Sequence, residues 1–254
     1  MADAGVHLLG EIGMLGLTKP KDIKEMLGWA RKYGMTVSAH FGGPTIVGSS
    51  SIPIDDMLEI QPDVVAHVNG GSTAPSLKDA ERIVQESYFT LEVIHNGNAW
   101  MTYQVINMLK ERGELNRAII GADNPTGVAY LPVSTDVMIA EISSFNQIPA
   151  QDAIAMGTGN TADTFGLNTG KIEVGKEADI LIIDRPLESV GDDALGAIEA
   201  GNTFGTAMIM VDGHIVALRG KDTTSTTKNV KIDGVEHNVE TYEEWARGAR
   251  HPGF

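Results

Sequence analysis

Five residues that could do chemistry recur at nearly constant intervals, each close to the about 30 residues that one strand and its crossover helix occupy. Each ends an apolar run, and they are Glu11, His40, His67, His95 and Asp123. The chain has no cysteine, so a metal ion would have to be held by imidazole nitrogen and carboxylate oxygen. Such ligands suit one or two divalent ions, and zinc, iron, manganese and nickel are all compatible with them. The series predicts a metal site assembled from separate elements.

The apolar runs that carry these residues are predicted to be parallel strands. They span residues 6–11, 35–40, 62–67, 89–95 and 117–123. Helical patterns separate and follow them, at residues 23–32, 55–60, 76–86, 100–112, 137–145 and 152–156. This alternation is typical of an α/β fold with a mostly parallel sheet and helices outside it. In a β/α barrel the carboxyl ends of the strands form the catalytic face, where all five residues would lie.

Capping residues support these helices. Thr18 is a predicted N-cap with Pro20 in the first turn, and Ser76 with Asp79 forms a predicted capping pair. Gly34 and Gly113 are predicted helix stops. Asn160 lies in a Gly-x-Gly-x-x-Ala pattern, but a helical segment precedes it, so we expect a helix cap here and no nucleotide loop.

The character of the chain changes after residue 166. Residues 167–220 contain β-rich runs, with a hairpin predicted at Asp212-Gly213. Residues 221–254 are polar and weakly patterned, which predicts an arm or a partly disordered tail.

Composition excludes several classes of partner. The formal net charge of −15 leaves no basic patch for phosphates, so nucleic acid and anionic membranes are not expected partners. No apolar stretch approaches the about 20 residues of a membrane span, and the first residues lack a signal-peptide pattern. A cytoplasmic protein is therefore expected.

The expected strand ends suggest a role for each ligand. Glu11 could bridge two ions through its two oxygens, and His40 with His67 would bind one ion. Asp123 is placed to take a proton from water and pass it to a leaving nitrogen.

Several runs of sequence resemble the amidohydrolase superfamily of metal-dependent hydrolases. They are Ala39-His-Phe-Gly-Gly43, Ala66-His-Val-Asn-Gly-Gly71, Gly121-Ala-Asp-Asn-Pro125, Thr158-Gly-Asn-Thr-Ala162 and Gly170-Lys-Ile-Glu-Val-Gly-Lys-Glu-Ala-Asp179. The resemblance covers about residues 6–216 and is strongest to members that open a cyclic enamide. It implies Glu11 as the metal bridge in place of a carbamylated lysine, His40 and His67 as ligands of one metal, and Asp123 as ligand and catalytic acid/base.

One departure from the superfamily bears on function. Members carry a His-x-His strand that supplies two ligands to the other metal, and no His-x-His occurs here. Residues 1–166 then correspond to about strands 4 to 8 of a (β/α)8 TIM barrel, followed by part of the small C-terminal β-domain. We expect a partner chain that supplies strands 1 to 3, or a homo-oligomer, because open strand edges invite pairing.

The sequence leaves three readings open. The chain is a hydrolase of a small cyclic amide completed from elsewhere, with one or two ions; it is a catalytically silent scaffold or regulatory subunit; or it is a fragment. Substrate contacts are predicted at His95, which is equally compatible with a satisfied structural histidine, and at the loop glycines Gly42, Gly43, Gly70 and Gly71. Of the other histidines, His7 is expected in the core, and His214, His237 and His251 in solvent.

Overall fold

The computed structural model describes residues 1–13, 17, 19–44, 51–70, 73–123, 132–218, 226 and 228–237. A five-stranded sheet forms its centre, with the strands in the order β1-β2-β3-β4-β5. Every neighbouring pair in this sheet is parallel, which confirms the predicted α/β class. The strands are β1 (Leu8–Ile12), β2 (Thr36–His40), β3 (Val64–Ala66), β4 (Thr90–Ile94) and β5 (Ala118–Gly121).

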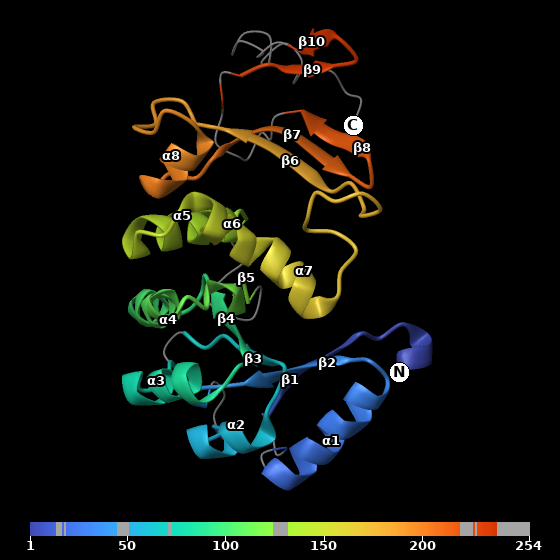
Figure 1. The fold of residues 1–254 in the computed structure, drawn as a ribbon, viewed down its shortest axis with the longest axis vertical. Coiled ribbons are helices and arrows are strands. Elements are labelled where there is room, and N and C mark those ends of the chain that lie inside the picture. The colour runs from blue at the N-terminus through green and yellow to red at the C-terminus, as the bar shows by residue number, and fades with distance from the viewer. Residues whose placement is uncertain are drawn as a thin grey trace.

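A helix follows each of these strands along the chain. The helices are α1 (Pro20–Lys32), α2 (Ile54–Ile60), α3 (Leu77–Glu86), α4 (Ala99–Arg112) and α5 (Ser134–Asn146). Two more come after α5, α6 (Ala150–Gly157) and α7 (Gly159–Phe165), and short 3-10 turns occupy Ala2–Ala4 and Leu115–Arg117. The strand-helix units follow one another along the long axis, from α1 in blue to α5, α6 and α7 in yellow-green (Figure 1).

The helices bury the faces that their apolar spacing predicts. In α1 the buried residues are Ile23, Leu27 and Ala30, spaced at one turn, and they join the core beneath Val37 of β2. Strand residues such as Val37 and Leu91 have no exposed surface, because helices cover the sheet. None of the described helices is long and apolar enough to cross a membrane.

Three capping predictions are confirmed and two are wrong. Ser76 accepts a hydrogen bond from the Asp79 amide, Gly34 with φ 71° follows the C-cap of α1, and Gly113 ends α4 with φ 68°. The N-cap of α1 is Lys19 and not Thr18, which lies outside the described residues; Pro20 at the first position has no N–H to satisfy. Asn160 lies inside α7 and is not its cap. Its side-chain amide donates instead to the carbonyls of Leu115 and Ala118 at 3.2 and 3.0 Å.

An antiparallel sheet follows α7, in the order β6-β7-β8. Its strands are β6 (Ile180–Asp184), β7 (Gly205–Val211) and β8 (His214–Leu218), with α8 (Ala194–Glu199) between β6 and β7. The predicted hairpin at Asp212-Gly213 is present, with φ 48° and 75° at the two turn residues. Asp179 accepts hydrogen bonds from the Asp212 amide and the Thr169 hydroxyl, so it ties the preceding turn to this hairpin.

Part of the polar C-terminal stretch is structured. A hairpin of β9 (Val230–Ile232) and β10 (Val235–His237) lies within the residues predicted as an arm. Thr226 is 1% exposed and donates to Asp184 of β6 at 3.1 Å, which anchors this stretch to the antiparallel sheet. Residues 238–254 lie outside the described residues.

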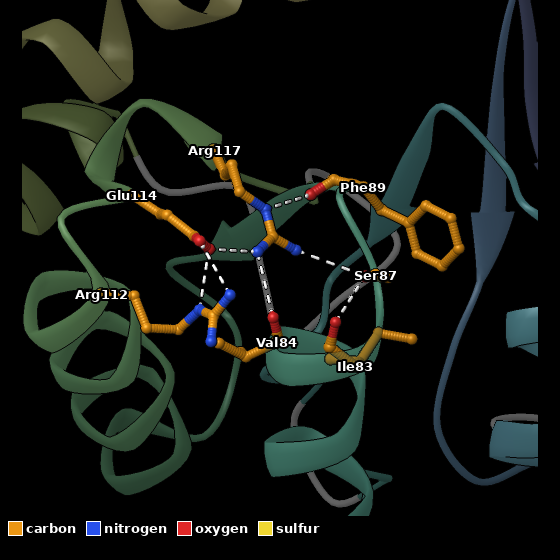
Figure 2. Close-up of polar contacts among 7 residues, drawn as sticks. All are labelled: Ile83, Val84, Ser87, Phe89, Arg112, Glu114 and Arg117. Carbon is orange, nitrogen blue, oxygen red and sulfur yellow. Dashed lines mark hydrogen bonds and ion pairs between the residues drawn. The ribbon is translucent and has the colours of Figure 1, made fainter.

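Arg117 connects the units that carry the last two residues of the periodic series. Its guanidinium donates to the carbonyls of Val84 and Phe89 and to Glu114 at 3.0, 3.1 and 2.6 Å. Figure 2 shows this side chain directed into the space between the end of α3 and the start of β4. The Arg117 side chain is only 8% exposed and that of Glu114 is 24% exposed, so the ion pair lies at the edge of the core just before β5.

Candidate metal centre

Glu11 lies in an irregularity of β1. The pairing of β1 with β2 shifts register between Leu9 and Ile12, and Glu11 has a left-handed φ of 43°. A β-bulge of this kind re-aims a side chain that regular pleating would place elsewhere. The bulge directs the Glu11 carboxylate toward the histidines of the next two strands.

His40 ends β2 and has no exposed surface. Its Nδ1 lies 3.1 Å from Glu11 Oε1 and its Nε2 lies 3.3 Å from the carbonyl oxygen of Gly43. A carbonyl can only accept, so this second contact requires a proton on Nε2. A neutral His40 therefore has its Nδ1 lone pair facing a carboxylate oxygen, an arrangement that a shared cation would satisfy.

His67 follows β3 directly and completes the cluster. Its Nε2 lies 2.5 Å from Glu11 Oε1 and 3.1 Å from His40 Nδ1. Its backbone is left-handed, with φ 36°. Its other ring nitrogen, Nδ1, is buried and has no hydrogen-bond partner among the described residues.

Glu11, His40 and His67 each offer a ligand atom, and these atoms all lie within 4.8 Å of one another. The three residues come from separate strands, and an imidazole and carboxylate set is what zinc or iron takes from proteins. These residues therefore fit a divalent ion held by imidazole and carboxylate groups, the ligand types that the sequence predicted.

The electrostatics of the cluster reflect its close contacts. Hydrogen bonds from His40 and His67 lower the pKa of Glu11 from 4.5 to about 2. Burial acts to lower the pKa of His67, but the hydrogen bond to Glu11 and the charges of Glu11 and Asp123 outweigh it, so this pKa lies above 6.5. Both shifts favour an ionised Glu11 beside a charged His67 when no metal ion is bound.

Asp123 lies beside this cluster without being one of its three members. It follows β5 and is partly exposed, with a left-handed φ of 52°. Its negative charge contributes to the raised pKa of His67, so it lies near enough to act on that imidazole. The side-chain amide of Asn96 donates to the main-chain oxygens of Ala122 and Asp123 at 2.9 and 3.3 Å, which holds the turn in place.

His95 occupies a different position from the three clustered residues. It lines a pocket between α4 and α5, together with Tyr103, Glu141 and Phe145. Its Nδ1 is buried without a hydrogen-bond partner among the described residues. Both readings of His95, a substrate contact and a structural histidine, stay predictions.

The remaining histidines divide in the same way. His7 is exposed, so its predicted place in the core is wrong; it precedes β1 and is not part of the strand face that Glu11 occupies. His214 is exposed, as predicted. The side chains of His237 and His251 lie outside the described residues.

Close main-chain contacts explain the glycines in the loops after β2 and β3. A Cβ at Gly42, where φ is 119°, would lie 2.4 Å from the carbonyl oxygen of Thr73. The amide of Gly43 donates to the same oxygen at 2.7 Å, and that of Gly70 donates to the His67 carbonyl at 2.6 Å. The loops after β2 and β3 therefore touch through their main chains, while substrate contact at these glycines stays a prediction. Gly71 lies outside the described residues.

Glu92 is a site residue that the periodic series does not include. It lies in β4, and its Oε2 accepts a hydrogen bond from the His67 amide at 3.2 Å. Burial raises its pKa above 4.5, although the His67 hydrogen bond acts in the opposite direction. A signal was present in the sequence, because Glu92 is a carboxylate within the run Leu-Glu-Val-Ile, where a strand covered on both faces is expected to be apolar.

Comparison with known proteins supplies the family. The model of the Amidohydrolase family matches residues 64–216, more than half of the chain. The enamidase of Eubacterium barkeri is 39% identical over 232 residues, which are 91% of this chain and 60% of the enamidase. The chain therefore spans about three fifths of the length of this relative.

The fold agrees with solved structures of the same superfamily. The crystal structure of enamidase, described as a new member of the amidohydrolase superfamily, superposes with a TM-score of 0.85 at 39% identity, over 89% of this chain and 59% of that one. A β-aspartyl dipeptidase from Fervidobacterium islandicum AW-1 shares the fold at a TM-score of 0.52 and 18% identity, over 88% of this chain and 56% of that one. The match of sequence over most of the chain and the match of fold lead to one conclusion: this chain belongs to the amidohydrolase family.

Proposed function

We propose that this chain forms the metal-binding part of a hydrolase that opens the C–N bond of a small cyclic amide or enamide, as in enamidase. The observation that carries the proposal is the convergence of Glu11, His40 and His67 on one point, with ligand atoms within 4.8 Å of one another. The likeness to enamidase at 39% identity supports the substrate class.

In this proposal Glu11, His40 and His67 hold a divalent ion, with zinc or iron the expected metals and manganese or nickel compatible ones. A bound ion supplies a Lewis acid that polarises a carbonyl and makes water acidic enough to act near neutral pH. Glu11 has a second carboxylate oxygen that can reach a second ion. The Gly43 carbonyl orients His40 by accepting a hydrogen bond from its Nε2–H.

Asp123 takes a proton from water and gives it to the leaving nitrogen. It is partly exposed and its charge acts on His67, so it borders both solvent and the cluster. An ionised carboxylate in such a place can alternate between base and acid during one turnover. His95 and the glycines Gly42, Gly43, Gly70 and Gly71 are the proposed substrate contacts.

We also propose the extent of each part. Residues 1–166 form about strands 4 to 8 of a (β/α)8 barrel, 167–220 belong to the C-terminal β-domain, and 221–254 form an appended segment. The sequence has no His-x-His pair, so strands 1 to 3 with that pair come from a complementary polypeptide or segment, and the chain works as part of an oligomer. Its location in this proposal is the cytoplasm.

Reconstitution tests this function. The chain would be purified alone and co-expressed with the His-x-His-bearing part of enamidase that it does not match, and metal content and hydrolysis of a cyclic enamide would be measured. We expect hydrolysis only from the metal-loaded complex. The Asp123→Asn complex should keep its metal and lose activity by about 100- to 10,000-fold, the usual contribution of a general acid/base.

The control is Asp152→Asn on the exposed side of α6, which should hydrolyse the enamide like the parent complex. A metal-loaded complex that cleaves no cyclic amide would contradict the proposal and favour a silent scaffold. Full activity in the Asp123→Asn complex would remove the acid/base role from this residue. One ion per active complex would identify a mononuclear site.

A further inference from the structure

We infer that Glu92 is a positioning residue, whose partly buried carboxylate holds the main chain of His67 so that the imidazole faces Glu11 and His40. The inference rests on the proposed metal site, and it gives a role to a residue outside the ligand set. In the described residues the group that could hold an ion comprises Glu11, His40 and His67, and does not include Glu92.

Glu92 binds two consecutive amides of the turn after β3. Its carboxylate Oε2 accepts from the His67 N–H at 3.2 Å, and its main-chain oxygen accepts from the Val68 N–H at 2.8 Å. The side chain and the main chain of this one residue of β4 thus take the place of the regular hydrogen-bond pattern between parallel strands at the point where β3 ends. The side chain accepts a hydrogen bond from the His67 N–H, which the strand pairing leaves without an acceptor.

This contact falls on a residue with an unfavourable backbone. His67 has φ 36°, in the left-handed region that a side chain with a Cβ adopts at a cost. Such a conformation persists where its surroundings hold it, and it is common at functional sites. The Glu92 carboxylate is positioned to do this, because it binds the amide of the strained residue itself.

The neighbouring strand keeps space for the carboxylate. A Cβ at Gly121 of β5 would lie 2.2 Å from Glu92 Oε1 and 2.9 Å from its Cδ. Gly121 has no left-handed backbone that would require glycine, so the side chain of Glu92 is the reason for the missing Cβ. Burying a carboxylate is costly unless it is hydrogen-bonded, which argues for a role at this position.

Three variants of the full chain separate positioning from other roles. Glu92→Gln keeps an acceptor oxygen, Glu92→Leu removes it, and Gly121→Ala displaces the carboxylate without removing it. Gly28→Ala is the matched control, since a Cβ at Gly28 of α1 meets nothing within 4 Å. The measurements are the amide proton shift of His67 in the metal-free chain and the Kd for Co²⁺ followed by its visible absorption.

We expect Glu92→Gln and Gly28→Ala to keep the His67 amide shift, with Kd values within about threefold of the parent chain. Glu92→Leu and Gly121→Ala should move that shift upfield and weaken Co²⁺ binding by about 10- to 100-fold, as loss of outer-shell support does elsewhere. If Glu92→Leu does not fold, comparison of Gly121→Ala with Glu92→Gln tests the same role of the carboxylate.

Two results would overturn the inference. One is an unchanged His67 amide in both Glu92→Leu and Gly121→Ala. The other is equal loss of Co²⁺ affinity in Glu92→Gln and Glu92→Leu, which would make the negative charge itself the requirement. If the parent chain binds no Co²⁺, the proposed metal site fails, while the metal-free amide shifts still decide whether Glu92 holds His67.

Discussion

The imidazole rings of His40 and His67 meet edge to face, with their centroids 4.7 Å apart and their planes at 67°. The two rings come from neighbouring parallel strands, and the same oxygen of Glu11 contacts a nitrogen of each. Two imidazoles in this arrangement turn their nitrogens to one point. This geometry is compatible with a ligand shared by the two rings.

Loss of one imidazole should abolish tight metal binding. In His67→Ala we expect the Kd for Zn²⁺ to rise by more than the about 10- to 100-fold that outer-shell changes cause, because a ligand itself is lost. His7→Ala removes an exposed histidine and should leave the Kd unchanged. Competition with a chromogenic chelator measures both, and equal affinities would contradict the proposed site.

The metal-free chain should show a stability window set by the cluster. The pKa of Glu11 is lowered from 4.5 to about 2, so its stabilising effect is present above pH 4.5 and lost as pH falls toward 2. The pKa of His67 lies above 6.5, so its stabilising effect is present below pH 6.5 and lost as pH rises through that higher value. The stabilising effects of Glu11 and His67 are therefore present together between pH 4.5 and pH 6.5.

Comparison of Tm between the parent chain and Glu11→Gln measures this window. The difference should be largest between pH 4.5 and 6.5 and should narrow on both sides. A difference that is constant from pH 3 to pH 8 would show that Glu11 and His67 do not share a proton. The measurement requires a chelator, since a bound ion would replace that proton.

Gly97→Ala should destabilise the loop that follows β4. A Cβ at Gly97 would lie 2.0 Å from Nδ2 of Asn69, whose amide bonds both the N–H and the carbonyl of Ile94. Overpacking of this kind costs about 1–3 kcal/mol. Gly28→Ala in α1 is the control, since its Cβ meets nothing and alanine stabilises a helix by about 0.5–1 kcal/mol. Urea unfolding should separate the two variants in opposite directions.

Arg117→Met should lower the free energy of unfolding by about 2–4 kcal/mol. The substitution leaves the buried carbonyl of Val84 and the carbonyl of Phe89 without the guanidinium that donates to them. Arg112→Met is the matched control, since this arginine pairs with the same Glu114 from a more exposed position and should change stability by at most about 0.5 kcal/mol. Equal destabilisation of the two variants would show that Arg117 acts only through Glu114.

The parallel strands and three of the site residues could be predicted from periodicity. Strand ends on one edge of a sheet bring distant residues together, so Glu11, His40 and His67 converge as their spacing indicates. The left-handed backbone of Glu11, His67 and Asp123 could not be read in this way, because it depends on a bulge and on turns that pairing imposes.

Other errors have local causes. Asn160 has the side chain of a helix cap, but its amide donates to the carbonyls of Leu115 and of Ala118 at the start of β5, and only the packed structure brings them near. His7 has the spacing of a strand residue, but β1 begins after it. Glu92 was visible as a charge in an apolar run, yet its contact with the His67 amide depends on where β3 ends.

The bulged strand β1 has a consequence for assembly. Among the described residues β1 pairs with β2 alone, and it carries Glu11, whose side chain is 40% exposed. A further strand pairing along β1 would therefore meet the metal ligands directly. Binding of an ion and pairing of that strand would be reciprocal: each would strengthen the other by the same factor. Chelation would then weaken the assembly as well as the chemistry, and the cellular supply of metal would set how much of the complex exists.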